Sequence, residues 1–260
     1  MIVQDFHIHT NFCDGTGSPR EMIEAAIARG MKKIGLVCHS YTPFDKSYCI
    51  KEERIDEFIS VVKALAAEYS QKITVLCGVE QDFWSECKTD RFDFAIGSVH
   101  YVKKGGVYRD IDLSRESFSK TVDQEYGGDF FAFCEDYYST LGDIKKRTGA
   151  NIVGHFDLIT KFNQDDCLFD TRDARYQRAA YTALDKLLGE DVIFEVNTGA
   201  ISRGYKSEAY PSLEFVRYIH QNGGRLVLSS DSHSIKTIGY DFERYEQLLF
   251  KMGIEINEAL

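Results

Sequence analysis

The sequence contains no apolar run that approaches the roughly 20 residues needed to cross a membrane as a helix. At its start, the strand-like segment IVQDFHIH follows Met1 directly, without the basic and apolar stretches of a signal peptide. Both absences lead us to expect a protein with no membrane partner and a cytoplasmic location.

Cysteine is present, but it lacks the spacing of a disulfide framework or a structural zinc site. The seven cysteines are scattered, odd in number and form no CxxC pair. This pattern favours reduced thiols in the cytosol. Cys38 and Cys77 fall within apolar runs, so we expect both in the core.

Positive charges are outnumbered by negative ones, and proline is scarce. The formal net charge of −10 disfavours nucleic acid as the main partner, because its backbone would be repelled, although a local basic site could still bind one phosphate. The chain has only three prolines and no linker, internal repeat or low-complexity tract. Its 260 residues suit one α/β barrel, so we predict a single domain over 1–260.

Strand and helix patterns alternate along the chain, which predicts parallel strands joined by helices. The predicted strands are 2–9, 33–39, 73–80, 92–102, 151–158, 192–198 and 225–231. Helices are predicted from Ser18 to Gly30, where Ser18 and Glu21 form a capping box, and at 51–70, 172–188, 211–223 and 241–252. Segment 103–150 looks helical, with a loop around Gly127-Gly128, and is a candidate insertion or lid.

Metal-capable side chains gather where the predicted strands end. His7 and His9 are two residues apart, as are Asp231 and His233, and such residues share one face of a strand. Because parallel strands of a barrel all end at one face, the whole set is predicted to converge there. The nine candidate ligands are His7, His9, Asp14, His39, Glu80, His100, His155, Asp231 and His233.

Each candidate alone has an ordinary structural explanation, such as a turn for Asp14 before Gly15. The complete set does not, because buried carboxylates and imidazoles are costly unless they are paired or bind metal. Imidazole and carboxylate without thiolate favour Zn, Mn or Fe, and nine ligands are too many for one ion. We therefore predict two or three divalent ions. His220 lies in the last turn of a helix and is assigned no chemistry.

These motifs resemble those of the polymerase and histidinol phosphatase (PHP) superfamily. The resemblance runs through DFHIHTNFCDG at 5–15, His39, GVE at 78–80, SVH at 98–100, GH at 154–155 and SDSH at 230–233. It covers essentially the whole chain in motif order. Length and layout are similar to the stand-alone histidinol-phosphate phosphatases of histidine biosynthesis.

The resemblance implies how the ligands divide among the ions. One metal would be held by His7, His9, Glu80 and Asp231, and Glu80 would bridge to a second metal held by His100 and His155. A third would take Asp14, His39 and His233, and its occupancy stays open because some relatives carry histidine at the position of Asp14.

Other polar residues are candidates for phosphate binding and for orienting the ligands. Arg203, Lys161 and Ser40 are the candidate phosphate contacts. Glu195 and Asn197 are two residues apart, so they lie on the same face of their strand. They would either orient the metal ligands from behind or form buried structural hydrogen bonds.

We predict a distorted (β/α)7 TIM-like barrel with the metal site at its C-terminal face. The resemblance implies hydrolysis of L-histidinol phosphate to L-histidinol and phosphate by a metal-bridging hydroxide, with Asp231 and His233 as proton carriers. Two alternatives remain: a PHP phosphoesterase acting on nucleotides or nucleic-acid ends, and a non-catalytic metal-binding scaffold. For the organic half of the substrate, the sequence offers Tyr101, Tyr108, Asp110, Asp112 and Glu116 without choosing among them.

Overall fold

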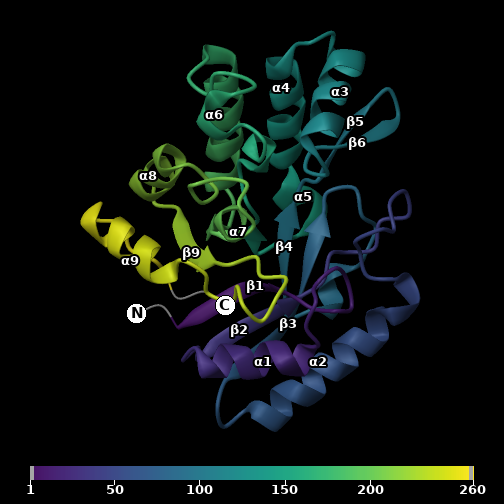
Figure 1. Ribbon diagram of the computed structural model, residues 1–260, viewed down its shortest axis with the longest axis vertical. Coiled ribbons are helices and arrows are strands. Elements are labelled where there is room, and N and C mark those ends of the chain that lie inside the picture. The colour runs from purple at the N-terminus through teal and green to yellow at the C-terminus, as the bar shows by residue number, and fades with distance from the viewer. Residues whose placement is uncertain (1–2, 258–259) are drawn as a thin grey trace.

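A computed structural model of the protein describes residues 3–257 and 260. Its centre is a seven-stranded parallel sheet in the order β1-β2-β3-β4-β7-β8-β9 (Figure 1). The strands are β1 (Gln4–His9), β2 (Lys33–Val37), β3 (Thr74–Asp82), β4 (Phe94–Ser98), β7 (Ile152–Val153), β8 (Ile193–Asn197) and β9 (Arg225–Ser229).

The edge strands β1 and β9 approach each other and nearly close the sheet into a barrel. Ile8 and Ser232 form a parallel bridge. The His9 amide donates to the Ser232 carbonyl at 2.8 Å, and the Ser232 amide donates to the His7 carbonyl at 3.0 Å. The predicted distorted (β/α)7 barrel is therefore confirmed, and the first and last strands of the sheet are neighbours.

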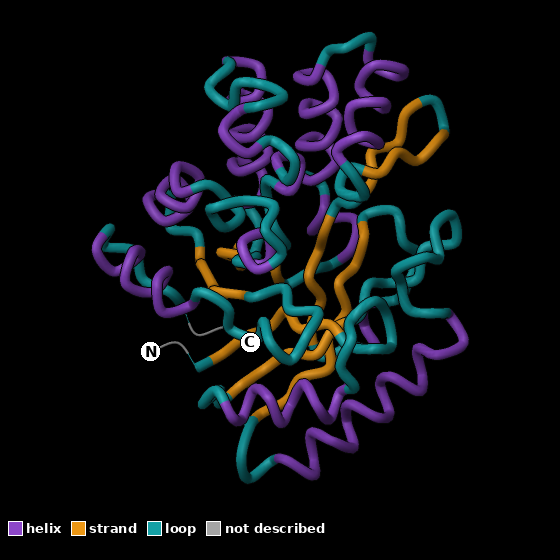
Figure 2. Tube along the Cα trace, in the orientation of Figure 1, coloured by secondary structure: helices purple, strands orange, loops and turns teal. Residues whose placement is uncertain are grey.

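Helices surround the sheet on its outer side (Figure 2). Five of them are α1 (Pro19–Ala28), α2 (Ile55–Tyr69), α6 (Ala174–Leu188), α8 (Leu213–Gln221) and α9 (Phe242–Lys251), and α7 (Gly199–Ser202) is a single turn. Short 3-10 turns are η1 (Glu52–Arg54), η2 (Thr89–Arg91), η3 (Leu158–Thr160) and η4 (Gln164–Asp166). At the start of α1, Ser18 and Glu21 form the predicted capping box. No helix in the described part of the chain is long and apolar enough to span a membrane.

The segment between β4 and β7 departs from prediction over residues 99–110. A single strand over 92–102 followed by helix was wrong, because β4 ends at Ser98 and a hairpin of β5 (Tyr101–Lys104) and β6 (Val107–Asp110) follows. The Gly105-Gly106 pair makes the turn, with φ values of 56° and 85° that favour glycine. The helices α3 (Arg115–Tyr126), α4 (Phe130–Leu141) and α5 (Ile144–Thr148) then form as predicted, with Gly127-Gly128 between the first two.

The strand predicted over 151–158 was also too long, since β7 contains only Ile152 and Val153. Beyond it, Gly154 lies so close to β4 that a Cβ atom there would be 2.4 Å from the Ser98 hydroxyl oxygen. The His155 amide donates to the Glu195 side-chain carboxylate on β8 at 3.0 Å instead of to a backbone carbonyl of that strand. The chain can therefore turn at the mouth of the barrel.

The inward faces of the strands change from apolar to polar along the barrel. Its floor is packed with apolar side chains, namely Phe6, Val37, Phe94, Ile96, Ile152, Ile193 and Val227. Gly35 and Gly78 leave room for the Phe94 ring, because a Cβ at either position would be within 2.5 Å of it. Since inward positions recur every second residue, Glu80 follows Gly78 and Glu195 follows Ile193 toward the carboxyl ends.

A second apolar layer lies between the outer face of the sheet and the helices. Cys38 and Cys77 belong to this layer and are buried, as predicted. All seven cysteines are free thiols.

Asp5 connects the first strand to the segment that follows the last. It is fully buried, and its Oδ1 accepts from the amides of His7 and Ser230, while Oδ2 accepts from the Ser230 hydroxyl and the Gly239 amide. Burial raises the pKa of Asp5 to about 6, so the carboxylate is ionised at neutral pH.

We expect Asp5→Asn to lower the free energy of unfolding by about 3 kcal/mol, because an amide nitrogen would replace one acceptor oxygen opposite buried donors. Urea unfolding of the metal-free protein measures this change. The exposed Asp123→Asn on α3 is the control and should shift stability by less than about 0.5 kcal/mol. Equal midpoints for the two variants would contradict a role for Asp5 in holding the barrel closed.

Candidate metal centre

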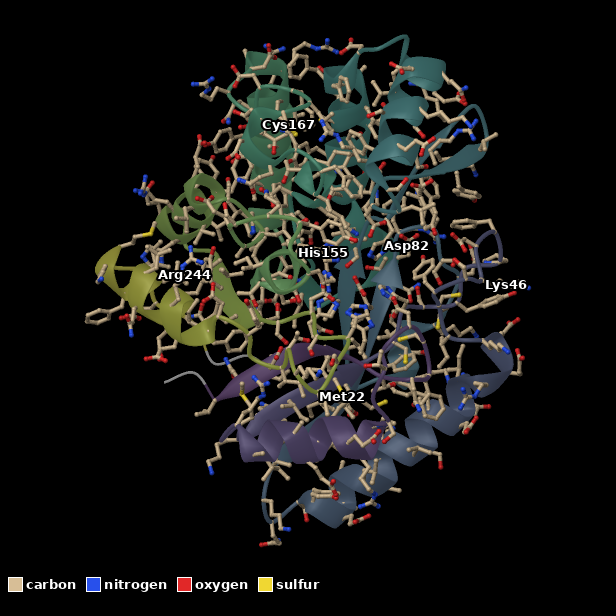
Figure 3. All side chains as sticks on the ribbon, in the orientation of Figure 1. Met22, Lys46, Asp82, His155, Cys167 and Arg244 are labelled. Atoms are coloured by element: carbon tan, nitrogen blue, oxygen red, sulfur yellow. The ribbon has the colours of Figure 1, made fainter. Side chains whose placement is uncertain are left out.

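A cavity of about 330 Å³ opens at the carboxyl ends of the strands. Figure 3 shows His155 and Asp82 at the centre of the molecule, between the upper helices and the part of the sheet that lies above α1 and α2. Seven of the nine predicted ligands line this cavity: Asp14, His39, Glu80, His100, His155, Asp231 and His233. His7 and His9 are fully buried beneath it.

Glu80 is the geometric centre of the site. Its two carboxylate oxygens face different groups of imidazoles. Oε2 lies 3.2 Å from His7 Nε2, 3.3 Å from His9 Nε2 and 2.9 Å from His39 Nδ1. Oε1 lies 3.3 Å from His100 Nε2 and 2.9 Å from His155 Nε2. A carboxylate with one oxygen toward each group is arranged as a bridge between two cations would be.

Asp231, two residues beyond the end of β9, faces the first of these groups. Its Oδ1 lies 3.6 Å from His7 Nε2 and 3.4 Å from His9 Nε2. Asp231 adopts a positive φ of 48°, a conformation that is uncommon outside glycine and is often found where function demands it. The two pairs spaced by two residues, one from each end of the sequence, therefore meet in one place.

A further group lies at the rim around the exposed Asp14. Its Oδ1 is 3.6 Å from His39 Nε2 and its Oδ2 is 3.3 Å from His233 Nε2. The His9 ring stacks on the His233 ring with centroids 4.1 Å apart. His9 joins these three residues in a set whose ligand atoms lie within 4.8 Å of one another, so it stands between the rim and the deeper group.

The burial of the candidate ligand atoms, which are ring nitrogens and carboxylate oxygens, tests whether metal ions fit the site. Four buried atoms at its heart have no partner with hydrogen-bond geometry: His7 Nε2, His9 Nε2, His39 Nδ1 and Glu80 Oε2. Buried polar atoms are rarely left unpartnered, and imidazole nitrogen with carboxylate oxygen is a donor set that divalent zinc, manganese or iron accepts. The residues present therefore fit divalent metal ions.

The charges of the imidazoles and carboxylates also favour bound cations. Burial lowers the pKa of His7, but the carboxylates of Glu195, Asp231 and Glu80 outweigh it and raise that pKa to about 10. Burial would raise the pKa of Glu80, yet the surrounding imidazoles hold it well below its usual range. The carboxylates thus require positive charge at their centre, which either protons on the imidazoles or metal ions supply.

Two carboxylates behind the cluster orient its imidazoles. Glu195 Oε1 is 2.7 Å from His7 Nδ1, and the Asn197 amide donates to Glu195 Oε2 at 3.1 Å. Asp82 accepts from the His100 amide at 3.0 Å and lies 3.3 Å from His100 Nδ1. Such partners fix which ring nitrogen is free to bind metal. Asp82 was missed in the sequence, although it shares strand parity with Glu80.

The three candidate phosphate contacts occupy different positions. Arg203 lines the cavity and donates to Asp231 Oδ2 at 2.8 Å, and its other nitrogen donates to the Asp231 carbonyl at 2.9 Å. Lys161 also lines it and donates to the Asp112 carbonyl at 2.7 Å. Ser40 is buried, is not among the lining residues, and accepts from the Asp82 amide at 3.0 Å.

The outer wall of the cavity combines residues from the hairpin and from the loop after β2. Of the five residues that the sequence offered for the organic half of a substrate, Tyr101, Asp110 and Asp112 line the cavity, whereas Tyr108 and Glu116 do not. The loop contributes Asp45, Ser47 and Tyr48, which sequence reasoning missed because no strand pattern marked them. His220 is half-buried in α8 and does not line the cavity.

Comparison with known proteins gives consistent matches over the chain. A model of the PHP domain family matches residues 5–199. A Deinococcus radiodurans protein named "Probable histidinol-phosphatase" is 29% identical over 251 residues, which cover 92% of this chain and 89% of that protein.

Two solved structures share the fold. One is a candidate histidinol phosphatase from Listeria monocytogenes, with a TM-score of 0.81 and 22% identity over 93% of this chain and 99% of that one. The other is the histidinol phosphate phosphatase of Lactococcus lactis, solved with zinc, L-histidinol and phosphate. Its TM-score is 0.67, with 21% identity over 97% of this chain and 94% of that one. Because the family model matches most of the sequence, the chain belongs to the PHP domain family.

Proposed function

We propose that this protein is a histidinol-phosphatase, which hydrolyses L-histidinol phosphate to L-histidinol and inorganic phosphate in histidine biosynthesis. The observation that carries the proposal is the Glu80 carboxylate surrounded by five imidazoles at the mouth of a PHP barrel. The Deinococcus relative and the Lactococcus structure, which contains L-histidinol and phosphate, support this substrate over other phosphate monoesters.

Two or three divalent ions, drawn from zinc, manganese and iron, are the proposed cofactors. His7, His9, Glu80 and Asp231 would hold one, Glu80, His100 and His155 the second, and Asp14, His39 and His233 the third. Divalent ions bound there supply Lewis-acid chemistry, lowering the pKa of water and offsetting charge on phosphoryl oxygens. The zinc in the Lactococcus structure supports this choice of cofactor.

The chain's own residues would orient the phosphate and handle its protons. The Arg203 guanidinium and the Lys161 ammonium line the cavity and would bind phosphoryl oxygens. Asp231 would accept the proton of the attacking water and pass it to His233 Nδ1, which lies 3.6 Å from Asp231 Oδ1, and His233 would return that proton to the leaving alcohol oxygen. Burial and the neighbouring His9 lower the pKa of His233, so its imidazole is neutral near pH 7 and can receive the proton from Asp231 before it releases the proton to the leaving group. Ser40 would act indirectly, by holding the β3 backbone at Asp82.

Two other functions are less well supported. A nucleotide or nucleic-acid substrate would bring further phosphates against a wall that contains Asp45, Asp110 and Asp112, and the net charge of −10 would repel it as well. A non-catalytic scaffold would not need all nine candidate ligands together with an open cavity beside Arg203.

The proposal also covers the domain organisation, the cellular location and the partners of the enzyme. We propose that residues 1–260 act as one PHP-type barrel domain, in which 103–150 is an insertion that forms part of the cavity wall. A cytoplasmic location is supported by seven cysteines that are all free, since oxidising compartments favour disulfides. A small-molecule phosphate monoester is the proposed partner, without nucleic acid or membrane.

The test is phosphate release by the metal-loaded protein from three substrates. We expect L-histidinol phosphate to be hydrolysed with a kcat/KM at least about tenfold above that of a nucleoside 3′,5′-bisphosphate or a short oligonucleotide. Complete removal of metal by a chelator should abolish the activity, and added zinc or manganese should restore it. Activity that survives metal removal would contradict the metal-dependent reaction, and a preference for the bisphosphate would favour the nucleotide alternative.

A further inference from the structure

A sulfur atom lies behind the imidazole of His9. The ring is fully buried and turns Nε2 toward Glu80 Oε2 at 3.3 Å and Asp231 Oδ1 at 3.4 Å. Its other nitrogen, Nδ1, lies 3.5 Å from Cys13 Sγ, which is a hydrogen-bond distance for sulfur. The nearest carboxylate oxygen, Asp14 Oδ1, is 3.9 Å from Nδ1 and too far for a hydrogen bond. Cys13 is therefore the hydrogen-bond partner of this nitrogen.

Two other imidazoles of the site have a carboxylate in the corresponding place. His7 Nδ1 is 2.7 Å from Glu195 Oε1, and His100 Nδ1 is 3.3 Å from Asp82 Oδ2. An ionised carboxylate only accepts hydrogen bonds, so it keeps the proton of the ring on Nδ1 and leaves Nε2 free for a metal ion. A thiol both donates and accepts, so it does the same only if its own proton is directed elsewhere.

The carbonyl of Thr10 takes the proton of the thiol. Cys13 Sγ donates to this carbonyl at 3.5 Å, so the sulfur presents a lone pair to His9 Nδ1–H. The hydrogen bonds then run in one direction, from the imidazole to the sulfur and from the sulfur to the backbone. This order leaves His9 Nε2 without a proton, on the side where Glu80 and Asp231 lie.

The turn that carries Cys13 is fixed by its own backbone. The Thr10 carbonyl also accepts from the amides of Cys13 and Gly15, both at 3.1 Å. A Cβ atom at Gly15 would lie 2.7 Å from the Thr10 nitrogen, so only glycine lets the turn close this tightly. The next amide, that of Thr16, donates to the His233 carbonyl at 2.8 Å. The sulfur is therefore in place before a metal ion arrives, and binding costs little conformational entropy.

The geometry does not make Cys13 a metal ligand itself. Among the described residues, no group of side chains whose ligand atoms lie within 4.8 Å of one another includes it. Its sulfur faces the Nδ1 side of the His9 ring, whereas Glu80 and Asp231 face the Nε2 side. The ring therefore stands between the sulfur and the deeper group of ligands.

We infer that Cys13 is a positioning residue of the metal centre, whose thiol holds His9 in the tautomer and orientation that bind an ion together with Glu80 and Asp231. The inference rests on the proposed metal-dependent function and adds a residue that acts through His9 without contacting the substrate. Because the role needs one acceptor and one donor on the same atom, serine can replace cysteine in it and alanine cannot.

The first measurement is zinc affinity, from competition between the metal-free protein and a chromogenic chelator. We expect Cys13→Ala to bind one zinc ion about ten- to a hundredfold more weakly than the wild type, because the partner behind a metal-bound imidazole is lost. Cys13→Ser should recover most of that affinity. Cys87→Ala is the matched control, since Cys87 is also partly buried but does not line the cavity, and it should bind zinc as the wild type does.

Two further readouts separate positioning from other roles of the thiol. The cobalt-loaded wild type should show no sulfur-to-cobalt charge-transfer band, because the sulfur contacts His9 and not the ion. Hydrolysis of L-histidinol phosphate by Cys13→Ala should fall at limiting zinc and return in excess zinc with an unchanged KM. A misfolded variant would not recover in this way.

Three results would contradict the positioning role and leave the phosphatase in place. They are a zinc affinity of Cys13→Ala equal to that of the wild type, a Cys13→Ser variant as weak as Cys13→Ala, and a charge-transfer band that Cys13→Ser removes. A wild type that binds no divalent ion contradicts the proposed function and the positioning role together. A wild type that binds zinc without hydrolysing L-histidinol phosphate contradicts the phosphatase alone, and the zinc affinities of the variants still decide the role of Cys13.

Discussion

Replacing Glu80 by glutamine is expected to lower kcat/KM for L-histidinol phosphate by about a thousandfold or more, equivalent to about 4 kcal/mol of transition-state stabilisation. The reason is that one carboxylate faces both imidazole groups, His7, His9 and His39 through Oε2 and His100 and His155 through Oε1. A neutral amide supplies only one acceptor oxygen, so the charge that would hold two ions together is lost.

Metal analysis of the purified variant makes this expectation specific to Glu80. We expect Glu80→Gln to retain at least one ion fewer than the wild type. Glu195→Gln is the matched comparison, because Glu195 is equally buried but contacts His7 from behind, at Nδ1. It should reduce activity by about ten- to a hundredfold. If Glu80→Gln kept full metal content and activity, Glu80 would not be the bridge.

The second large effect is expected for Arg203→Ala, which should reduce kcat/KM by about a hundred- to a thousandfold. Arg203 is the guanidinium that lines the cavity, and its nitrogens lie 2.8 Å from Asp231 Oδ2 and 3.3 Å from His233 Nδ1. It would therefore face both the phosphoryl oxygens and the two proposed proton carriers. Steady-state kinetics with L-histidinol phosphate measures the loss.

Arg203→Lys should recover only part of the activity, because an ammonium group cannot make the two parallel hydrogen bonds of a guanidinium. Arg244→Ala is the control, since Arg244 pairs with Asp241 on the surface, far from the labelled His155 (Figure 3). Unchanged metal content in Arg203→Ala would separate phosphate binding from a disturbed Asp231. A kcat/KM equal to that of the wild type would remove Arg203 from the site.

The two variants probe different parts of one arrangement. Glu80 is buried and neutralised by imidazoles, so its replacement acts through the metal ions. Arg203 lies nearer the opening, with about a third of its side chain exposed, so its replacement acts on the substrate. Measuring metal content together with kinetics for both distinguishes a damaged metal centre from a damaged phosphate site.

Much of the barrel and the ligand set could be predicted from local sequence pattern. Strand periodicity places His7 with His9 and Glu80 on inward faces, and the alternation of strands with helices requires those faces to meet at one end of a parallel barrel. The pairs His7/His9 and Asp231/His233 support this inference, because the alternation of side chains between the two faces of a strand needs only three consecutive residues. Errors arose where local pattern and tertiary contact compete, as in the hairpin after Ser98 and the short strand β7.

The sequence by itself determined the barrel topology, the candidate metal ligands and the acidic balance of the chain. Only the tertiary structure decided that Glu80 stands between two imidazole groups and that His9 also belongs to the rim. The physical reason is that periodicity decides which face of a strand a side chain occupies. Its partners across the cavity depend on barrel closure and on the way the hairpin and the loop after β2 pack together, which join residues far apart in the sequence.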